Sequence, residues 1–145
     1  MGITETLHFK EVDWSTAAGD IMEIRKRVFV IEQRFEKEIL CDNRDDNSYH
    51  ILVTNNNKEP IACGRLCPNG RIGRIAVLMN YRGKGIGTMV LAKLIKIAEK
   101  SSIPSLSLNV ETDLSPFYDQ QKFYADGPVY MKQGVPHQRM TKRLA

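Results

Sequence analysis

The sequence predicts a mixed α/β fold, in which one mostly antiparallel sheet of about six to seven strands carries helices on both faces. Two patterns support this fold. Several apolar runs of strand length follow one another between residues 49 and 78, separated by turns rich in Asn, Gly and Pro. Further along, a strand pattern passes through a glycine-rich turn directly into a long helical pattern. The chain has 145 residues and no linker-like segment, so we expect residues 1–145 to form a single domain.

The first third of the chain combines one strand, one helix and one irregular connection. Alternating apolar residues predict a short strand at residues 7–9. Ser15 or Thr16 is expected to cap an amphipathic helix that ends near Gln33, because apolar residues recur at spacings of three and four (Ile21, Ile24, Val28 and Ile31). Residues 34–48 are rich in acidic side chains, and we expect a partly helical connection there.

The remaining elements follow from their apolar patterns. They are strands at residues 49–53, 61–66 and 72–78, a helix from Ile86, a strand at 106–110, a short helix from Ser115, and strands at 129–131 and 137–143. The helix from Ile86 has apolar residues on all sides, so we expect it to be buried against the sheet. In the strand at 106–110 the apolar side chains share one face, which places Asn109 and Glu111 together on the other.

Composition and charge exclude several classes of protein. The 42% hydrophobic and 26% charged residues are typical of a soluble globular protein. No apolar stretch approaches the roughly 20 residues of a membrane span, and the N-terminal segment lacks the apolar core of a signal peptide, so we expect a cytoplasmic protein without membrane contact. The net charge of +4 suits a polyanionic cofactor, but it is too small and too scattered to indicate nucleic-acid binding.

The three cysteines, Cys41, Cys63 and Cys67, do not form a C-x-x-C motif. A structural zinc site needs four ligands, usually presented in turns. We therefore expect reduced thiols, with neither a disulfide nor a metal site.

The turn Arg82–Gly87, with the sequence RGKGIG, is the strongest functional signal in the chain. Alternate glycines permit positive φ angles and a close backbone approach that a side chain would block. Successive amide groups can then point inward at the positive end of the helix dipole and form an anion site. Arg82 and Lys84 add positive charge beside these amides. The turn therefore predicts a cofactor that carries a phosphate or pyrophosphate.

Two other phosphate-binding motifs are alternatives for this turn. The nucleoside-triphosphate loop needs Lys-Ser or Lys-Thr after its last glycine, and no glycine of this chain precedes such a pair. The dinucleotide fingerprint would use Gly83 and Gly85, but Thr88 stands in place of its third glycine. Glu111 is a candidate for the ribose-binding acid of that fingerprint. A nicotinamide-dependent oxidoreductase therefore stays a remote alternative.

The turn also matches the R/Q-x-x-G-x-G/A signature and thereby resembles the GNAT superfamily of N-acetyltransferases. The resemblance extends to the lead-in Ile75-Ala76-Val77 with Asn80-Tyr81-Arg82, to the strand at 106–110, and to Ser115-Pro116-Phe117-Tyr118. Two further segments are similar to the small ElaA-like branch. They are Arg27–Gln33 and Gly134–Met140.

The resemblance implies acetyl-CoA as co-substrate, with no metal. It also implies that the strands at 72–78 and 106–110 splay apart, so that backbone amides of the first strand hold the cofactor arm. Tyr118 is then expected to face the cofactor sulfur and donate a proton, and Asn109 to bond the cofactor chain. The residues implied for cofactor binding are Ile75, Ala76, Val77, Arg82, Gly83, Lys84, Gly85, Ile86, Gly87, Asn109 and Tyr118.

The general base is less clear from the sequence. Many GNAT enzymes carry an acid on the strand at 72–78, but Arg71, Gly73 and Arg74 occupy that stretch here. Glu111 is the preferred candidate and Glu32 the second, while His137 and His50 are weaker ones. The family also places a glycine where Lys122 precedes Phe123, so the short helix is expected to end by another route.

The expected activity is direct transfer of an acetyl group to a primary amine, either of a small molecule or of a lysine or N-terminus. We expect acidic residues and His137 to surround a cationic amine, with apolar walls; the candidates are Glu32, Asp45, Asp46, His137, Tyr49 and Phe35. Because the strand at 72–78 lacks its acid, a non-catalytic CoA-binding sensor or interaction module stays an alternative. A homodimer is compatible with the sequence.

Overall fold

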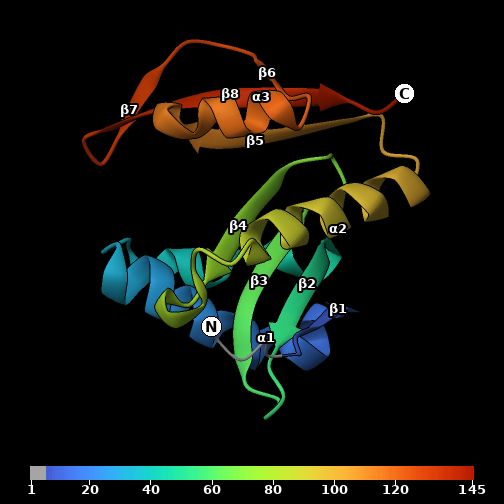
Figure 1. Ribbon diagram of the computed structural model, residues 1–145, viewed down its shortest axis with the longest axis vertical. Coiled ribbons are helices and arrows are strands. Elements are labelled where there is room, and N and C mark those ends of the chain that lie inside the picture. The colour runs from blue at the N-terminus through green and yellow to red at the C-terminus, as the bar shows by residue number, and fades with distance from the viewer. Residues whose placement is uncertain (1–5) are drawn as a thin grey trace.

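The computed structural model describes residues 6–145 (Figure 1). Its strands are β1 (His8–Val12), β2 (Tyr49–Thr54), β3 (Pro60–Leu66), β4 (Ile72–Val77), β5 (Ser105–Glu111), β6 (Tyr124–Ala125), β7 (Tyr130–Lys132) and β8 (Val135–Arg143). The α-helices are α1 (Trp14–Arg25), α2 (Ile86–Lys100) and α3 (Ser115–Gln120). A π-helical turn, η1 (Lys26–Glu32), extends α1, and 3₁₀ turns occur at η2 (Lys37–Leu40), η3 (Asp45–Asn47), η4 (Met79–Tyr81) and η5 (Thr112–Leu114). No helix of residues 6–145 is both long and apolar enough to cross a membrane.

The strands form two antiparallel sheets rather than one continuous sheet. The first has the order β1-β2-β3-β4, and in the second β8 pairs with β5, β6 and β7. The two sheets meet at a single parallel bridge between Arg71 and Ser107, where the Ser107 amide donates to the Gly70 carbonyl at 3.0 Å. The mixed, mostly antiparallel fold predicted from the sequence is therefore confirmed. The dinucleotide alternative is wrong, because its fold requires a parallel sheet.

Residues 6–145 form eight strands, against the about six to seven expected. The unexpected strand is β6, which is only two residues long. Such a short strand cannot produce an alternating pattern, and it exists because β8 offers it a pairing edge.

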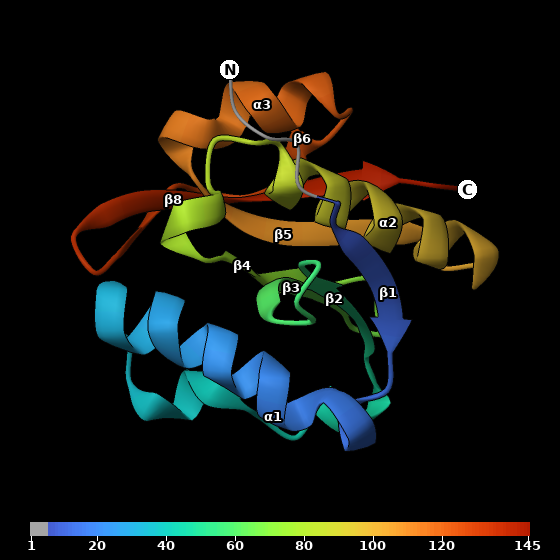
Figure 2. The ribbon, with the colours of Figure 1, turned by 60° about the horizontal axis from the view of Figure 1, so that its bottom comes forward.

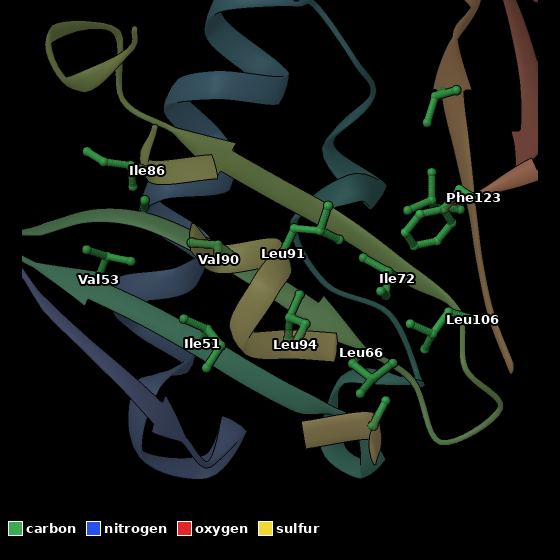
Figure 3. Close-up of a cluster of buried hydrophobic side chains, with 14 of the residues drawn as sticks. Ile51, Val53, Leu66, Ile72, Ile86, Val90, Leu91, Leu94, Leu106 and Phe123 are labelled. Carbon is green, nitrogen blue, oxygen red and sulfur yellow. The ribbon is translucent and has the colours of Figure 1, made fainter. Parts of the chain in front are cut away.

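Helices cover both faces of the first sheet, as expected (Figure 2). In β2, Ile51 and Val53 pack with α2, whereas Leu52 packs with α1, because successive side chains of a strand point to opposite faces. Figure 3 shows Val90 and Leu94 of α2 among the strand residues of this core.

The expectation that α2 is buried against the sheet is confirmed, although only one face of the helix is covered. Its buried residues share one face (Ile86, Val90, Leu91, Leu94 and Ala98), while Met89 on the outer side is 48% exposed. One layer of sheet covers only one side of a helix, so the other side stays open to solvent.

The first helix begins earlier than predicted. Asp13 is the N-cap residue, without a side-chain cap hydrogen bond, and neither Ser15 nor Thr16 caps the helix. The Thr16 hydroxyl instead donates to the Asp13 carbonyl at 3.2 Å. The helical segment ends at Glu32 through η1, one residue before the predicted end at Gln33.

Candidate active site

The glycine loop lies between β4 and α2. Gly83 and Gly85 have φ angles of +76° and +78°, the left-handed conformation that favours glycine. A Cβ atom at either position would meet nothing within 4 Å, so conformation rather than space requires glycine there. Gly85 is the N-cap of α2 and has no side-chain cap hydrogen bond, which leaves the amides of the first turn without a side-chain acceptor. Gly87 lies within that turn. This geometry suits an anion.

The two cations of the loop are placed differently. The Arg82 Nε donates to the Val77 carbonyl at 2.9 Å, and its Nη1 and Nη2 both bond to Glu32. Arg82 therefore ties the loop to the end of η1 and does not project freely toward a ligand. The Lys84 ammonium lies 5.4 Å from the ring centroid of Tyr81.

The gap between the two sheets widens beyond the Arg71–Ser107 bridge, because no other pairing joins β4 to β5 within residues 6–145. The register of β4 against β3 shifts opposite this gap, and Arg74 has a φ angle of +53° there. A left-handed conformation is unusual for a residue with a large side chain, and such strain is concentrated at functional sites. The splay that the family resemblance implied is therefore present.

A cavity of about 240 Å³ lies in this gap. Its walls come from η1, the following connection, the four segments β3, β4, β5 and β7, and α3. The lining residues are Phe29, Gln33, Phe35, Ile39, Arg65, Arg71, Ile72, Gly73, Arg74, Ile75, Leu108, Asn109, Tyr118 and Lys132. The cavity brings together three of the residues implied for cofactor binding, Ile75, Asn109 and Tyr118. It does not include Glu32 or Glu111.

Tyr118 is held by the way in which α3 ends. The amide of Phe123 donates to the Tyr118 carbonyl, and that of Lys122 to the Asp119 carbonyl, both at 3.0 Å. Lys122 has a φ angle of +69°, so the helix closes through the left-handed residue typical of glycine, and the expectation of a different route is wrong. The Phe123 ring is fully buried and meets the Tyr118 ring edge to face at 6.0 Å.

Burial raises the pKa of the Tyr118 phenol. The hydroxyl therefore carries its proton at neutral pH and can donate it to an acceptor in the cavity.

The candidate bases lie outside the cavity. The hydrogen bond from Arg82 lowers the pKa of Glu32, which weakens Glu32 as a base. Glu111 is exposed at the end of β5, opposite His137 on β8. His50 is fully buried, its Nε2 lies 2.9 Å from the Asp45 carbonyl, and burial lowers its pKa.

The expected acidic acceptor wall is also absent from the cavity. Asp45 is fully buried in ion pairs with Arg25 and Arg65, and Asp46 is exposed outside the cavity. Tyr49 packs against the hydrophobic core, whereas Phe35 lines the cavity as predicted.

The cationic residues of the lining were not predicted to be functional. In the sequence, Arg71 and Arg74 stand out only because they occupy the stretch where the resemblance implies an acid. Lys132 carries no sequence signal, because β7 is short and exposed.

All three cysteines are free thiols; Cys63 and Cys67 are buried, and Cys41 is exposed. Burial raises the pKa of the Cys63 thiol to about 12. No cysteine lines the cavity in the described part of the chain. Within residues 6–145, no group of three or more His, Cys, Asp and Glu side chains is placed to hold a metal ion.

Comparison with known proteins identifies the class to which this fold and site belong. The family model of the acetyltransferase (GNAT) domain matches residues 18–144. The chain therefore belongs to the GNAT family of acetyltransferases, enzymes that transfer acetyl groups, and the resemblance drawn from the glycine loop is confirmed.

Individual relatives agree with this assignment. YjcF of Bacillus subtilis, described as an uncharacterized N-acetyltransferase, is 31% identical over 127 residues, which cover 85% of this chain and 90% of YjcF. ElaA of Escherichia coli is 26% identical over 148 residues, covering 97% and 95% of the two chains. The crystal structure of ElaA has a TM-score of 0.83 at 24% identity and covers 95% of this chain and 100% of its own. An acyl-CoA N-acyltransferase from Pseudomonas aeruginosa has a TM-score of 0.82 at 22% identity, covering 96% and 99% of the two chains.

Proposed function

We propose that this protein transfers the acetyl group of acetyl-CoA directly to a primary amine. The observation that carries the proposal is the cavity at the split between β4 and β5, which holds Tyr118 and Asn109, together with the glycine loop that follows β4. Strand β4 thus connects the glycine loop, which suits an anion, to the cavity that holds the proton donor Tyr118.

The residues present fit acetyl-CoA. The amides from Gly83 to Gly87 would hold its pyrophosphate, since their glycines adopt the conformation that turns amides toward an anion. The edge of β4 that faces the gap has no strand partner at residues 75–77 in the described chain. Apart from the Val77 carbonyl, which accepts from Arg82, the backbone groups on this edge are available for the pantetheine arm. Asn109 would add a side-chain amide from β5. Bound acetyl-CoA supplies an activated acetyl thioester.

Tyr118 is the proposed acid. Its phenol is protonated, lies in the cavity wall and is fixed by the closure of α3. It would protonate the thiolate that leaves when the nitrogen of the neutral amine takes the acetyl group, and the proton released from that nitrogen would restore the phenol, directly or through water. General acid catalysis of this kind contributes about 10²–10⁴-fold to a rate.

Direct transfer is favoured because no cysteine lines the cavity within residues 6–145. Of the buried thiols, Cys63 is kept protonated by its raised pKa of about 12. An acetyl-enzyme intermediate on cysteine therefore has no nucleophile at the proposed site.

The proton of the attacking amine has no carboxylate or imidazole acceptor in the lining formed by the described residues. We propose that the amine enters in its neutral form after losing its proton to water. Glu111 is the alternative base at the end of β5. Under the first proposal, kcat/KM rises with pH in parallel with the neutral fraction of the amine, and Glu111→Gln leaves the profile unchanged.

Calorimetry with acetyl-CoA and with CoA tests cofactor binding. Gly85→Asp places bulk and negative charge at the proposed pyrophosphate site and is expected to abolish binding while leaving the fold intact, as judged by circular dichroism. A folded wild-type protein that fails to bind millimolar acetyl-CoA would contradict the proposal.

Tyr118→Phe separates binding from catalysis. We expect unchanged acetyl-CoA affinity and a turnover reduced by about 10–1,000-fold. Unchanged turnover would show that Tyr118 serves only packing.

A non-catalytic CoA-binding module is the second candidate, and the absence of an acid from the cavity lining favours it. Such a protein would bind CoA but release no thiol with any member of a broad amine panel.

A further inference from the structure

The cavity beside Tyr118 is lined by cations. Its charged side chains are Arg65, Arg71, Arg74 and Lys132, and no aspartate or glutamate of residues 6–145 joins them. A lining of one charge sign in a partly enclosed site concentrates ligands of the opposite charge.

Two of these cations are already paired. The Arg65 Nη1 bonds to Asp42 at 2.8 Å and to Asp45 at 3.0 Å. The Arg74 Nη2 bonds to Asp42 at 3.2 Å, and its Nε to the Ile39 carbonyl at 3.3 Å. Their positions along the cavity wall are therefore fixed.

The other two cations have no anionic partner. Within the described residues, the side chains of Arg71 and Lys132 form neither an ion pair nor a hydrogen bond, and Arg71 is exposed. Lys132 lies over the ring of Phe35, 5.2 Å from its centroid, so a cation–π contact holds it at the wall without neutralising it.

The charge beneath the cavity has the same sign. The ion-pair network contains three arginines, Arg25, Arg65 and Arg74, and two aspartates, Asp42 and Asp45, which leaves a net charge of +1 (three minus two). His50 adds no charge to this network at neutral pH, since burial lowers its pKa.

The positive charge of Arg74 is also not fully neutralised by its carboxylate partner. Its burial, followed by repulsion from Arg65, lowers its pKa. Although a left-handed φ is costly for arginine, this residue keeps its cation at the cavity wall.

This positive site is distinct from the proposed pyrophosphate site. Arg71 lies just before β4 and the glycine loop follows its end, and six residues of strand span about 20 Å. The amides of the loop therefore bind the cofactor phosphates without using the cavity cations.

We infer that the acceptor is a small amine that carries its own carboxylate or phosphate, and that Arg71 and Lys132 bind this anionic group. Arginine suits both groups because its planar fork matches two oxygens at once. The inference rests on the proposed function and replaces the cationic acceptor expected from the sequence. The cavity volume of about 240 Å³ accommodates a small molecule.

Matched pairs of amines test the inference at fixed acetyl-CoA, with thiol release as the readout. β-Alanine against β-alaninamide isolates the carboxylate, and phosphoethanolamine against ethanolamine isolates the phosphate. Rates are compared at equal concentrations of neutral amine. We expect the anionic member of at least one pair to have a kcat/KM higher by about 10–100-fold, the scale of hydrogen bonds to charged groups. The pair that shows the preference identifies the anion.

Arg71→Gln and Lys132→Gln each should reduce that preference by about 10-fold and leave the KM for acetyl-CoA unchanged. Lys96→Gln is the matched control, because Lys96 is exposed on α2 and does not line the cavity. The inference is overturned if neither anionic amine is preferred, or if the control lowers the preference as much as the cavity variants do.

If no amine of the panel is acetylated, a binding measurement still tests the inference. Phosphoethanolamine and β-alanine are then titrated calorimetrically into CoA-saturated protein. Binding that is lost in Arg71→Gln supports the anion site, and absence of binding overturns it. Failure of acetyl-CoA itself to bind would instead refute the proposed function, so the two failures are distinguishable.

Discussion

Asp45 is the position where a single substitution should reveal most about how the site is supported. Its side chain is fully buried and accepts hydrogen bonds from Arg25 Nη1 at 3.0 Å, Arg25 Nη2 at 3.1 Å and Arg65 Nη1 at 3.0 Å. The amide of Asp42 adds a fourth at 2.9 Å. Asp45→Asn preserves the shape but removes the charge and turns one acceptor into a donor.

The expected cost follows from the burial of the partners. Arg25 is 1% exposed and Arg65 is 4% exposed, so neither guanidinium can turn to water when Asp45 is neutralised. Removing one member of a buried ion pair costs about 3–5 kcal/mol. Since a typical domain is stable by only about 5–15 kcal/mol, this is a large share of the total.

Urea unfolding followed by circular dichroism measures this loss. With a slope of about 1–3 kcal/mol per molar urea, the midpoint should fall by roughly 2 M. Asp46→Asn is the matched control, because Asp46 is the next residue, is exposed and has no ion pair within residues 6–145. Its expected change is below about 0.5 kcal/mol. Equal effects of the two substitutions, or a loss below about 1 kcal/mol for Asp45→Asn, would refute the reasoning.

The buried ion pairs of Asp45 also predict how the stability of the protein depends on pH. Burial raises the pKa of Asp45, but the hydrogen bonds from Arg25 and the Asp42 amide outweigh burial, so the folded-state pKa lies below the ordinary value of 3.8. A depressed pKa contributes stability that is present above 3.8 and is lost as the pH falls through the folded-state value. The stability difference between wild type and Asp45→Asn should therefore be constant near neutral pH and shrink in acid.

Four further outcomes are expected from single sites. Glu32→Gln removes the ion pair that holds Arg82 of the glycine loop. The KM for acetyl-CoA should therefore rise about 2–10-fold in steady-state assays, while the free energy of unfolding changes by less than about 1 kcal/mol. Gly64→Ala places a Cβ atom 2.6 Å from a valine methyl of α2 and should cost about 1–3 kcal/mol in urea unfolding. Lys122→Gly removes a left-handed lysine and should raise stability by up to about 1 kcal/mol, measured by calorimetric melting. In native protein only Cys41 should react quickly with a thiol reagent, and a fast reaction of all three thiols would show that the core is open.

The elements that the sequence predicts well depend on neighbouring residues. The glycine loop can be predicted from the six residues 82–87 alone, because its backbone conformation depends on its own glycines. Strand and helix periodicity is likewise local, and it predicts β2, β3 and β4 within about one residue of their observed bounds and the start of α2 at Ile86. Tyr118 lies in the cavity wall because α3 follows β5 after only a short turn, and its role as the acid stays a prediction.

The burial of Asp45 was beyond such local patterns. Asp45 and Asp46 are the same residue type at adjacent positions in one 3₁₀ turn, yet one is fully buried and the other exposed. The difference comes from Arg25 and Arg65, each 20 residues away along the chain. No periodicity of residues 34–48 encodes these partners, so the sequence placed Asp45 beside an amine, whereas the structure places it at the centre of a buried ion-pair network.

The charge of the cavity shows how a departure from a family pattern can carry information. In the sequence, the absence of an acid from the strand at 72–78 indicates only a missing base. The structure places Arg71 and Arg74 at that position in a cavity wall, with Lys132 joining them from β7. A site that exchanges an acid for cations next to the proposed reaction centre disfavours a cationic acceptor and favours an anionic one. The arginines that stand in place of the acid therefore weaken the assignment of a base, and they support the assignment of an anionic acceptor.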